Sequence, residues 1–256
     1  MYAEELAFAN AIADEADELA LAYFRTGLEV RTKADRTPVT EADLRVEATL
    51  RERLAERFPG DAIHGEEEGL SGDASRTWVV DPIDGTKNYA AGIQIWATLI
   101  ALLVDAEPVL GVTSAPALRE RYAAVRGEGA TLNGQRISVS GTRTLEEGFV
   151  LASGESSFLG GPDQRWFVEL MTRASRTRGF GDFWSHMLVA RGAADVALEP
   201  ELRVWDYAAL VPIVEEAGGR VSSVDGSPLR DGGSMLTTNG ALHDAVLSVV
   251  RGNAPA

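Results

Sequence analysis

The sequence predicts an α+β fold built from layered helices and sheets. The chain has 256 residues and 45% of them are hydrophobic, enough for one large domain or two closely packed halves. Two helical patterns are followed by several strand-like runs, and helices and strands then alternate. No long polar linker interrupts the chain. We therefore expect a single unit over residues 1–256, with halves 1–140 and 141–256 that share a cleft near residue 140.

Two amphipathic helices are predicted first. Residues 4–26 place apolar side chains three or four positions apart, and Gly27 marks the end of this pattern. Thr40 opens a second helix with apolar residues at four-residue spacing, which Pro59-Gly60 ends.

Short apolar runs then predict a series of strands. They cover residues 78–80, 96–104, 109–114, 122–125 and 137–139, and Asn133-Gly134 predicts a tight turn before the last. The second half mixes both elements. Its predicted strands are 149–153, 194–198, 221–224 and 235–237, and its predicted helices are 166–175, 183–191, 206–217 and 241–250.

The chain is strongly acidic, with a formal net charge of −15. Such a surface repels nucleic-acid backbones and anionic membranes, so we expect no nucleic acid and no membrane as partners. A phosphate substrate would require divalent cations that reverse the sign locally, and clustered carboxylates would bind those cations.

Several classes of protein are disfavoured by what the sequence lacks. There is no cysteine, and the three histidines have no zinc-binding spacing. Neither a GxSxG serine elbow nor a P-loop is present. The N-terminus MYAEELAFAN does not resemble a secretory signal, and the apolar stretch 95–104 is too short to span a bilayer. We therefore expect a cytoplasmic protein.

The most informative stretch is WVVDPIDGTKNY at residues 78–89. A buried strand delivers Asp81, Pro82 interrupts regular continuation, and Asp84 precedes a predicted helix start. Carboxylates at a strand end bind cations, and the N–H groups of a helix start hold phosphate oxygens. The alternative is a plain strand–turn–helix junction in which Asp84 only caps the helix.

Other acidic residues are individually weak candidates. Glu66, Glu67 and Glu68 are typical of a solvated loop, but they directly precede the strand that carries Asp81. Asp43 fits a capping box that begins at Thr40, and the local sequence favours that role. Asp206 lies at a predicted helix start, where aspartate is often a cap, and Glu199 ends a strand.

The chain resembles the inositol monophosphatase family through motifs between Lys33 and Gly240. They are GEE at 65–67, DPIDGTKNY at 81–89 and WDYAALVPIVEEAGG at 205–219. Within the family, GDFWSHMLVARGAAD at 181–195 and Lys87 resemble the histidinol-phosphate phosphatase branch.

The resemblance implies a layered αβαβα sandwich, a homodimer, and two or three magnesium ions per site. Most metal ligands fall in the first half and the substrate-facing residues in the second. The implied metal ligands are Glu66, Asp81, Asp84, Asp206 and the Ile83 carbonyl, with Glu67 nearby. The implied catalytic residues are Asp43, Glu66 and Thr86, and the backbone N–H groups of Gly85 and Thr86 would bind phosphate. Asp84, Asp182, Glu199 and Asp206 would contact the substrate.

These assignments predict magnesium-dependent hydrolysis of a small-molecule phosphate monoester, first of all L-histidinol phosphate, without a covalent intermediate. Carboxylates at Asp182 and Glu199 would complement its amine and imidazole. One alternative is an inositol-1-monophosphatase or another sugar or nucleotide phosphatase. Aspartyl-phosphate chemistry is disfavoured, because Asp81 and Asp84 are three residues apart rather than two. A non-catalytic, metal-binding regulatory module is a further alternative.

Overall fold

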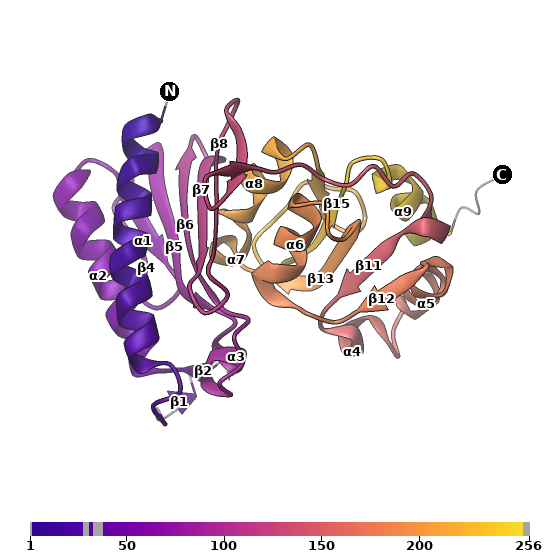
Figure 1. Ribbon diagram of the computed structural model, residues 1–256, viewed down its shortest axis with the longest axis horizontal. Coiled ribbons are helices and arrows are strands. Elements are labelled where there is room, and N and C mark those ends of the chain that lie inside the picture. The colour runs from indigo at the N-terminus through magenta and orange to yellow at the C-terminus, as the bar shows by residue number, and fades with distance from the viewer. Residues whose placement is uncertain (1, 28–30, 33–37, 253–256) are drawn as a thin grey trace. The chain divides into compact units, whose positions relative to one another are not determined.

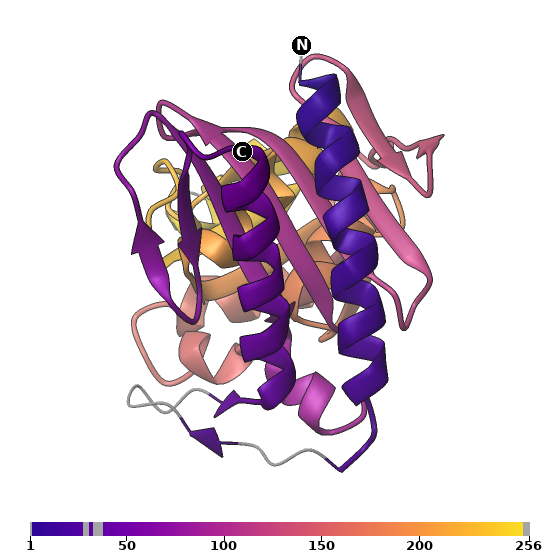
Figure 2. The ribbon, with the colours of Figure 1, turned by 90° about the vertical axis from the view of Figure 1, so that its left-hand side faces the viewer.

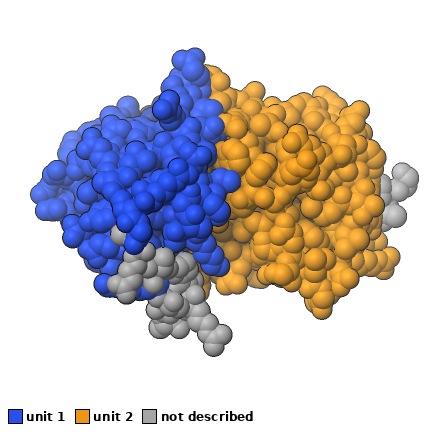
Figure 3. Space-filling model, turned by 60° about the horizontal axis from the view of Figure 1, so that its bottom comes forward, with its two compact units in different colours: residues 1–135, 205–213 blue, residues 136–204, 214–256 orange. Residues whose placement is uncertain are grey.

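The computed structural model describes residues 2–27, 31–32 and 38–252, and the chain forms two compact units (Figures 1 and 3). Unit 1 comprises Met1–Gln135 and Trp205–Ile213, and unit 2 comprises Arg136–Val204 and Val214–Ala256. A late segment of the chain therefore belongs to the first unit. The predicted halves 1–140 and 141–256, with their cleft, stay a prediction. Lys33, where the family resemblance begins, lies outside the described residues.

Two helices, α1 (Ala3–Tyr23) and α2 (Glu41–Arg57), lie on one face of the sheet of unit 1 (Figure 2). The buried face of α1 is largely alanine, which allows close helix packing, and the helix ends at Tyr23 rather than at residue 26. Thr40 is the N-cap of α2, as predicted, and the helix buries Val46, Leu50 and Leu54. A small ribbon of β1 (Arg31–Thr32) and β2 (Pro38–Val39) lies between the helices in sequence.

The sheet of unit 1 has the strand order β10-β9-β8-β7-β6-β5-β3-β4. Its strands are β3 (Ala62–Gly65), β4 (Gly69–Ser71), β5 (Arg76–Asp84), β6 (Ala97–Val104), β7 (Glu107–Ala115), β8 (Glu120–Val125), β9 (Gly129–Leu132) and β10 (Gln135–Arg136). Strands β3 and β5 are parallel, whereas β5, β6, β7, β8 and β9 pair antiparallel in turn. The carboxyl ends of β3 and β5 therefore meet at one edge, and acidic residues follow β3 and end β5.

Two strand predictions need correction. The strand predicted at 78–80 is β5, which continues through Pro82 to Asp84 because a register shift after Asp81 accommodates the proline. Residues 137–139 form no strand, although their apolar composition suggested one. Instead, the Val139 N–H donates to the Ala217 carbonyl at 3.0 Å.

The predicted helix at 206–217 is also wrong as a single element. It is divided into α7 (Val204–Tyr207) and α8 (Leu210–Glu216). The gap falls at residues 208–209, one turn before Pro212, which has no N–H to donate to the Ala208 carbonyl.

The segment Trp205–Ile213 packs on the sheet of unit 1 through a glycine. A Cβ at Gly111 on β7 would collide with the Ala209 carbonyl and with the ring of Pro212. Only glycine therefore permits this close backbone approach. The contact attaches the segment that carries Asp206 to the sheet that carries Asp81 and Asp84.

Unit 2 is built on a five-stranded mixed sheet with the order β12-β11-β13-β15-β14. Its strands are β11 (Phe149–Ala152), β12 (Arg176–Arg178), β13 (Val196–Leu202), β14 (Arg220–Ser222) and β15 (Gly233–Thr238). Its helices are the 3₁₀ turn η1 (Leu145–Glu147), α4 (Glu155–Phe158), α5 (Gln164–Arg173), α6 (Asp182–Ala190) and α9 (His243–Val250). Val150 packs with α5 and α9, whereas the next residue, Leu151, packs with α6. Because side chains alternate along a strand, helices cover both faces of this sheet.

Candidate metal centre

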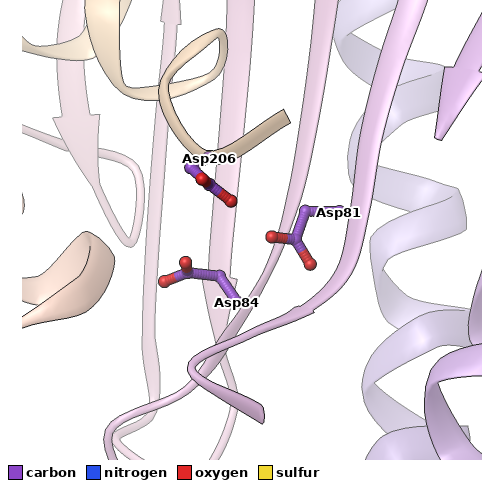
Figure 4. A group of neighbouring side chains, drawn as sticks. All are labelled: Asp81, Asp84 and Asp206. Carbon is purple, nitrogen blue, oxygen red and sulfur yellow. The ribbon is translucent and has the colours of Figure 1, made fainter. Parts of the chain in front are cut away.

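Three aspartates converge in unit 1 (Figure 4). Asp81 and Asp84 are supplied by β5 and Asp206 by α7. Each offers one carboxylate oxygen, and the three oxygens lie within 4.8 Å of one another. Asp81 is 1% exposed and Asp84 is 8% exposed. The arrangement brings several negative charges together where little water can screen them.

The irregularity in β5 explains how two of these side chains reach the same site. Residues an odd number of positions apart face opposite sides of a regular strand, so Asp81 and Asp84 would diverge. The register shift between them re-aims the second carboxylate. The buried Thr98 hydroxyl donates to the Pro82 carbonyl at 2.8 Å and holds the backbone within the shift.

The surroundings of Asp81 fit a hard divalent cation. Burial raises the pKa of its carboxyl well above the usual range, and the charges of Glu66, Asp84, Asp206 and Asp43 raise it further, in that order. Its Oδ1 atom is buried and has no hydrogen-bond partner among the described residues. Both features are costly, and both are relieved by a cation with oxygen ligands. The residues present therefore fit Mg²⁺.

Glu66 and Glu67 lie in the turn after β3, the parallel neighbour of β5. Among the neighbouring charges that raise the pKa of Asp81, that of Glu66 acts most strongly, which places Glu66 close to the aspartates. The group within 4.8 Å itself comprises Asp81, Asp84 and Asp206. The predicted role of Glu66 as a ligand, with Glu67 nearby, stays a prediction.

Asp43 is fully buried and uses its two oxygens differently. Oδ2 accepts hydrogen bonds from the Thr40 N–H at 2.8 Å and the Thr40 hydroxyl at 2.5 Å, which confirms the predicted capping box. Oδ1 accepts from the Thr86 hydroxyl at 3.4 Å. Burial raises the pKa of Asp43, while the bonds from Thr40 act in the opposite direction. The capping role and a contact with a predicted catalytic residue therefore coexist.

Thr86 begins α3 (Thr86–Ala90), with only Gly85 between this helix and the end of β5. Its hydroxyl also lies 3.1 Å from the Ile83 carbonyl, a predicted metal ligand whose oxygen has a second lone pair. Gly85 has a φ of 82°, a left-handed conformation that lets the chain turn sharply from strand to helix. That Gly85 and Thr86 offer N–H groups to a phosphate stays a prediction.

Asp182 and Glu199 belong to unit 2. Asp182 is the first residue of α6, and the N-cap is Gly181 without a side-chain capping bond, so Asp182 is not the helix cap. Its φ of 51° is unusual for a residue other than glycine. Glu199 accepts a hydrogen bond from the Ser153 hydroxyl at the point where the β13–β15 register shifts. Contact of either residue with substrate stays a prediction.

Two features near the site were not predicted. His64 on β3 packs edge-on against Trp205, with ring centroids 5.5 Å apart, and so connects the strand before Glu66 to the helix of Asp206. No local pattern signals that contact. Glu47 on α2 is fully buried and accepts the Glu67 N–H. Here a signal existed, because a charged residue at 47 shares a helix face with the apolar residues 50 and 54.

Comparisons with known proteins identify the family of this chain. The model of the inositol monophosphatase family matches residues 1–253. The chain belongs to this family. A histidinol-phosphatase of Mycobacterium tuberculosis is 46% identical over 252 residues, with 96% of this chain and 97% of the relative covered. A histidinol-phosphatase of Streptomyces coelicolor is 43% identical over 260 residues, with 96% of each covered.

The solved structures point to the same inositol monophosphatase family. The IMPase of Thermotoga maritima superposes with a TM-score of 0.88 at 30% identity, with 98% of both chains covered. The predicted α+β fold of the inositol monophosphatase type is thereby confirmed.

In the part of the chain that the structure describes, no helix is both long and apolar enough to cross a membrane.

Proposed function

We propose that this member of the inositol monophosphatase family is a magnesium-dependent phosphatase that hydrolyses L-histidinol phosphate to L-histidinol and phosphate. The observation that carries the metal-dependent chemistry is the group of Asp81, Asp84 and Asp206, with an Asp81 oxygen that has no hydrogen-bond partner among the described residues. The choice of substrate is supported by the two histidinol-phosphatases that are 46% and 43% identical along nearly their whole length.

Bound Mg²⁺ would neutralise phosphoryl oxygens and lower the pKa of a coordinated water. Asp81, Asp84 and Asp206 would hold it, with Glu66 and the Ile83 carbonyl as further ligands, and we propose two or three ions per site. This set consists only of oxygen donors, as Mg²⁺ prefers.

Asp43 and Thr86 would orient the attacking water and receive its proton. The Thr86 hydroxyl lies within 3.4 Å of Asp43 Oδ1, so a proton that reaches Thr86 Oγ1 has a carboxylate acceptor beside it. Burial raises the pKa of Asp43 and makes it a better base than an exposed aspartate. Asp43 Oδ2 stays bonded to Thr40, which fixes the orientation of the carboxyl group.

In unit 2, Asp182 and Glu199 would select the organic part of the substrate. Histidinol phosphate carries an amine and an imidazole. When these two groups are protonated they are cations, and carboxylates complement their charge. We also propose that the protein is a cytoplasmic homodimer, which rests on resemblance to the family.

Inositol monophosphate is the second candidate substrate. The structure of the IMPase of Thermotoga maritima, at a TM-score of 0.88, favours it. The metal site serves both substrates alike, so the difference must come from the residues that contact the alcohol.

The test is a comparison of kcat/KM for phosphate release from histidinol phosphate, inositol 1-phosphate, fructose 1,6-bisphosphate and a nucleotide bisphosphate. We expect histidinol phosphate to be preferred by at least about 100-fold, the equivalent of two charge-assisted contacts. A preference for inositol phosphate would replace the proposed substrate and leave the metal chemistry in place. No release from any of the four would contradict the proposed function and favour a non-catalytic module.

Asp182→Asn tests the origin of the preference. It should lower kcat/KM for histidinol phosphate about 10- to 100-fold and leave an aryl phosphate, which has no cation, unchanged. The matched control is Asp244→Asn, at an aspartate of α9 whose side chain is 86% exposed. This variant should leave kcat/KM unchanged for both substrates. Equal losses on both substrates in Asp182→Asn would indicate a displaced site instead.

A further inference from the structure

Glu47 binds the backbone of the turn that carries Glu66. The Glu47 side chain projects from α2 and is fully buried. Its Oε2 atom accepts the Glu67 N–H at 2.7 Å, and its Oε1 atom accepts the Glu68 N–H at 2.9 Å. One carboxylate thus satisfies the two N–H groups that directly follow Glu66.

Arg51 extends this contact to the next strand. It lies one helical turn after Glu47, and its Nε donates to Glu47 Oε1 at 2.8 Å. The rest of its guanidinium donates to the Gly69 carbonyl and, at 3.2 Å, to the Ser71 hydroxyl. The carboxylate therefore binds donors of the turn, and the guanidinium binds acceptors of β4.

Gly65 completes the fit between α2 and the turn. A Cβ at this position would occupy the space that the Glu47 carboxylate fills. The residue directly before Glu66 is therefore confined to glycine by the same carboxylate that binds the residues directly after it.

This arrangement is electrostatically expensive for a plain structural link. Glu47 is fully buried and the side chain of its partner Arg51 is 11% exposed, so both charges lose most of their hydration, and the attraction between them need not repay that loss. Apolar packing could attach α2 to the turn without that desolvation cost. Directed hydrogen bonds to two successive N–H groups, however, fix the backbone orientation on which the direction of the Glu66 side chain depends.

We propose that Glu47, assisted by Arg51, is a positioning residue that preforms the turn at 65–68 and aims Glu66 at the site of Asp81 before a cation binds. The part of the inference that concerns metal affinity rests on the proposed function. The part that concerns the turn itself does not.

Glu47→Gln is the decisive variant. Its amide has one acceptor oxygen and one NH₂ group, so one of the two turn N–H groups loses its acceptor. In metal-free protein, hydrogen exchange at the amides of Glu67 and Glu68 should accelerate by about 10-fold or more. The Mg²⁺ concentration for half-saturation, measured calorimetrically with the metal alone, should rise about 10- to 100-fold. At saturating Mg²⁺, kcat should recover to near the wild-type value.

Two controls and one further test variant separate positioning from general loss of stability. Leu54→Ala, at a fully buried residue of the same helix, should lower Tm and leave Mg²⁺ half-saturation unchanged. Glu41→Gln removes another ion pair of α2, the exposed one that Glu41 forms with Arg45 at 2.8 Å. It should change neither Tm nor the Mg²⁺ concentration for half-saturation. Arg51→Met keeps the aliphatic stem and should reproduce part of the Glu47→Gln effect, which provides a second test if Glu47→Gln folds poorly.

The outcomes distinguish this inference from the proposed function. Wild-type amide exchange and Mg²⁺ half-saturation in both Glu47→Gln and Arg51→Met would overturn the positioning role. If the wild-type protein bound no Mg²⁺, the proposed function and the metal part of the inference would fail together. Accelerated exchange in Glu47→Gln would then still establish that Glu47 holds the turn.

Discussion

Asp81 is buried among acidic neighbours, and one of its oxygens has no hydrogen-bond partner in the described part of the chain. A group in this position costs stability when no cation is bound. Residues that violate local stability rules in this way are typical of functional sites. The carboxylates should therefore oppose folding in the metal-free protein and be required for turnover.

Asp84→Asn tests both consequences at the scale of one residue. The change keeps the volume and removes one negative charge from the group. Turnover at saturating substrate should fall by about 100-fold or more, because a metal ligand has lost its charge. The metal-free variant should melt at a higher temperature than the wild type, since repulsion is relieved. Normal turnover with Mg²⁺ would show that the site is misassigned.

His186 provides a pH-dependent test outside the metal site. It is buried on α6, its Nδ1 lies 2.8 Å from the Thr237 hydroxyl, and burial lowers its pKa from 6.5 to about 4. Between pH 4 and pH 6.5, His186 of the unfolded chain binds a proton that His186 of the folded protein does not bind. The contribution of neutral His186 to the free energy of unfolding is therefore fully present above about pH 6.5. It is lost as the pH falls to 4, and the loss reaches about 3 kcal/mol.

His186→Asn should lose less stability than the wild type between pH 7 and pH 4.5, as measured by urea unfolding. Some loss will remain in the variant, because burial also lowers the pKa of His243 to about 4. Identical losses in the two proteins would mean that His186 is not buried in its neutral form.

At the scale of elements, three structural features bring the acidic residues together. The parallel pair β3 and β5 puts the Glu66 turn beside the end of β5, and the register shift in β5 aligns Asp81 with Asp84. The contact of Gly111 with the segment 205–213 then supplies Asp206. Each feature can be disturbed separately.

Gly111→Ala disturbs the last of them. The new methyl group would meet the Ala209 carbonyl, so the segment that carries Asp206 must shift away from β7. We expect a loss of about 1–3 kcal/mol in unfolding free energy and weaker binding of Mg²⁺ in calorimetry. Gly60→Ala is the matched control, because a Cβ there meets nothing within 4 Å. Equal Mg²⁺ affinity in the two variants would argue against Gly111 as the support of Asp206.

Sequence periodicity predicted most elements because their apolar positions reflect burial on one face. Thr40 gave the start of α2 correctly, since its capping box is local. Two of the failures have non-local causes. Proline was expected to end β5 at Asp81, but pairing with β6 carries the strand on to Asp84. Residues 137–139 have strand-like side chains, yet no strand pairs with them.

At the scale of the whole molecule, the motifs predicted three acids that the structure brings together, but not how the chain supports them. Asp81, Asp84 and Asp206 were predicted together from the family resemblance, and the structure brings their oxygens within 4.8 Å of one another. That residues 205–213 belong to unit 1 could not be inferred from local patterns, because the flanking chain belongs to unit 2. The support from Glu47 likewise depends on contacts about 20 residues apart in sequence.

A whole-molecule consequence follows for thermal stability. We expect Mg²⁺ to bind the folded site and not the dispersed chain, so Tm should rise with the logarithm of the Mg²⁺ concentration once that concentration exceeds the dissociation constant. At 100 times the dissociation constant the stabilisation is about 2.7 kcal/mol. A melting curve in millimolar Mg²⁺ should therefore lie well above the curve in EDTA. Coincident curves would count against a preformed site.

The most direct test of the central claim is phosphate release from L-histidinol phosphate by the wild-type protein, first in EDTA and then after addition of excess Mg²⁺. We expect negligible release in EDTA and steady, multiple turnovers once Mg²⁺ is in excess, because the carboxylates alone repel the dianionic substrate. Release at the same rate in EDTA, or none in either condition, would contradict magnesium-dependent hydrolysis at the site of Asp81, Asp84 and Asp206.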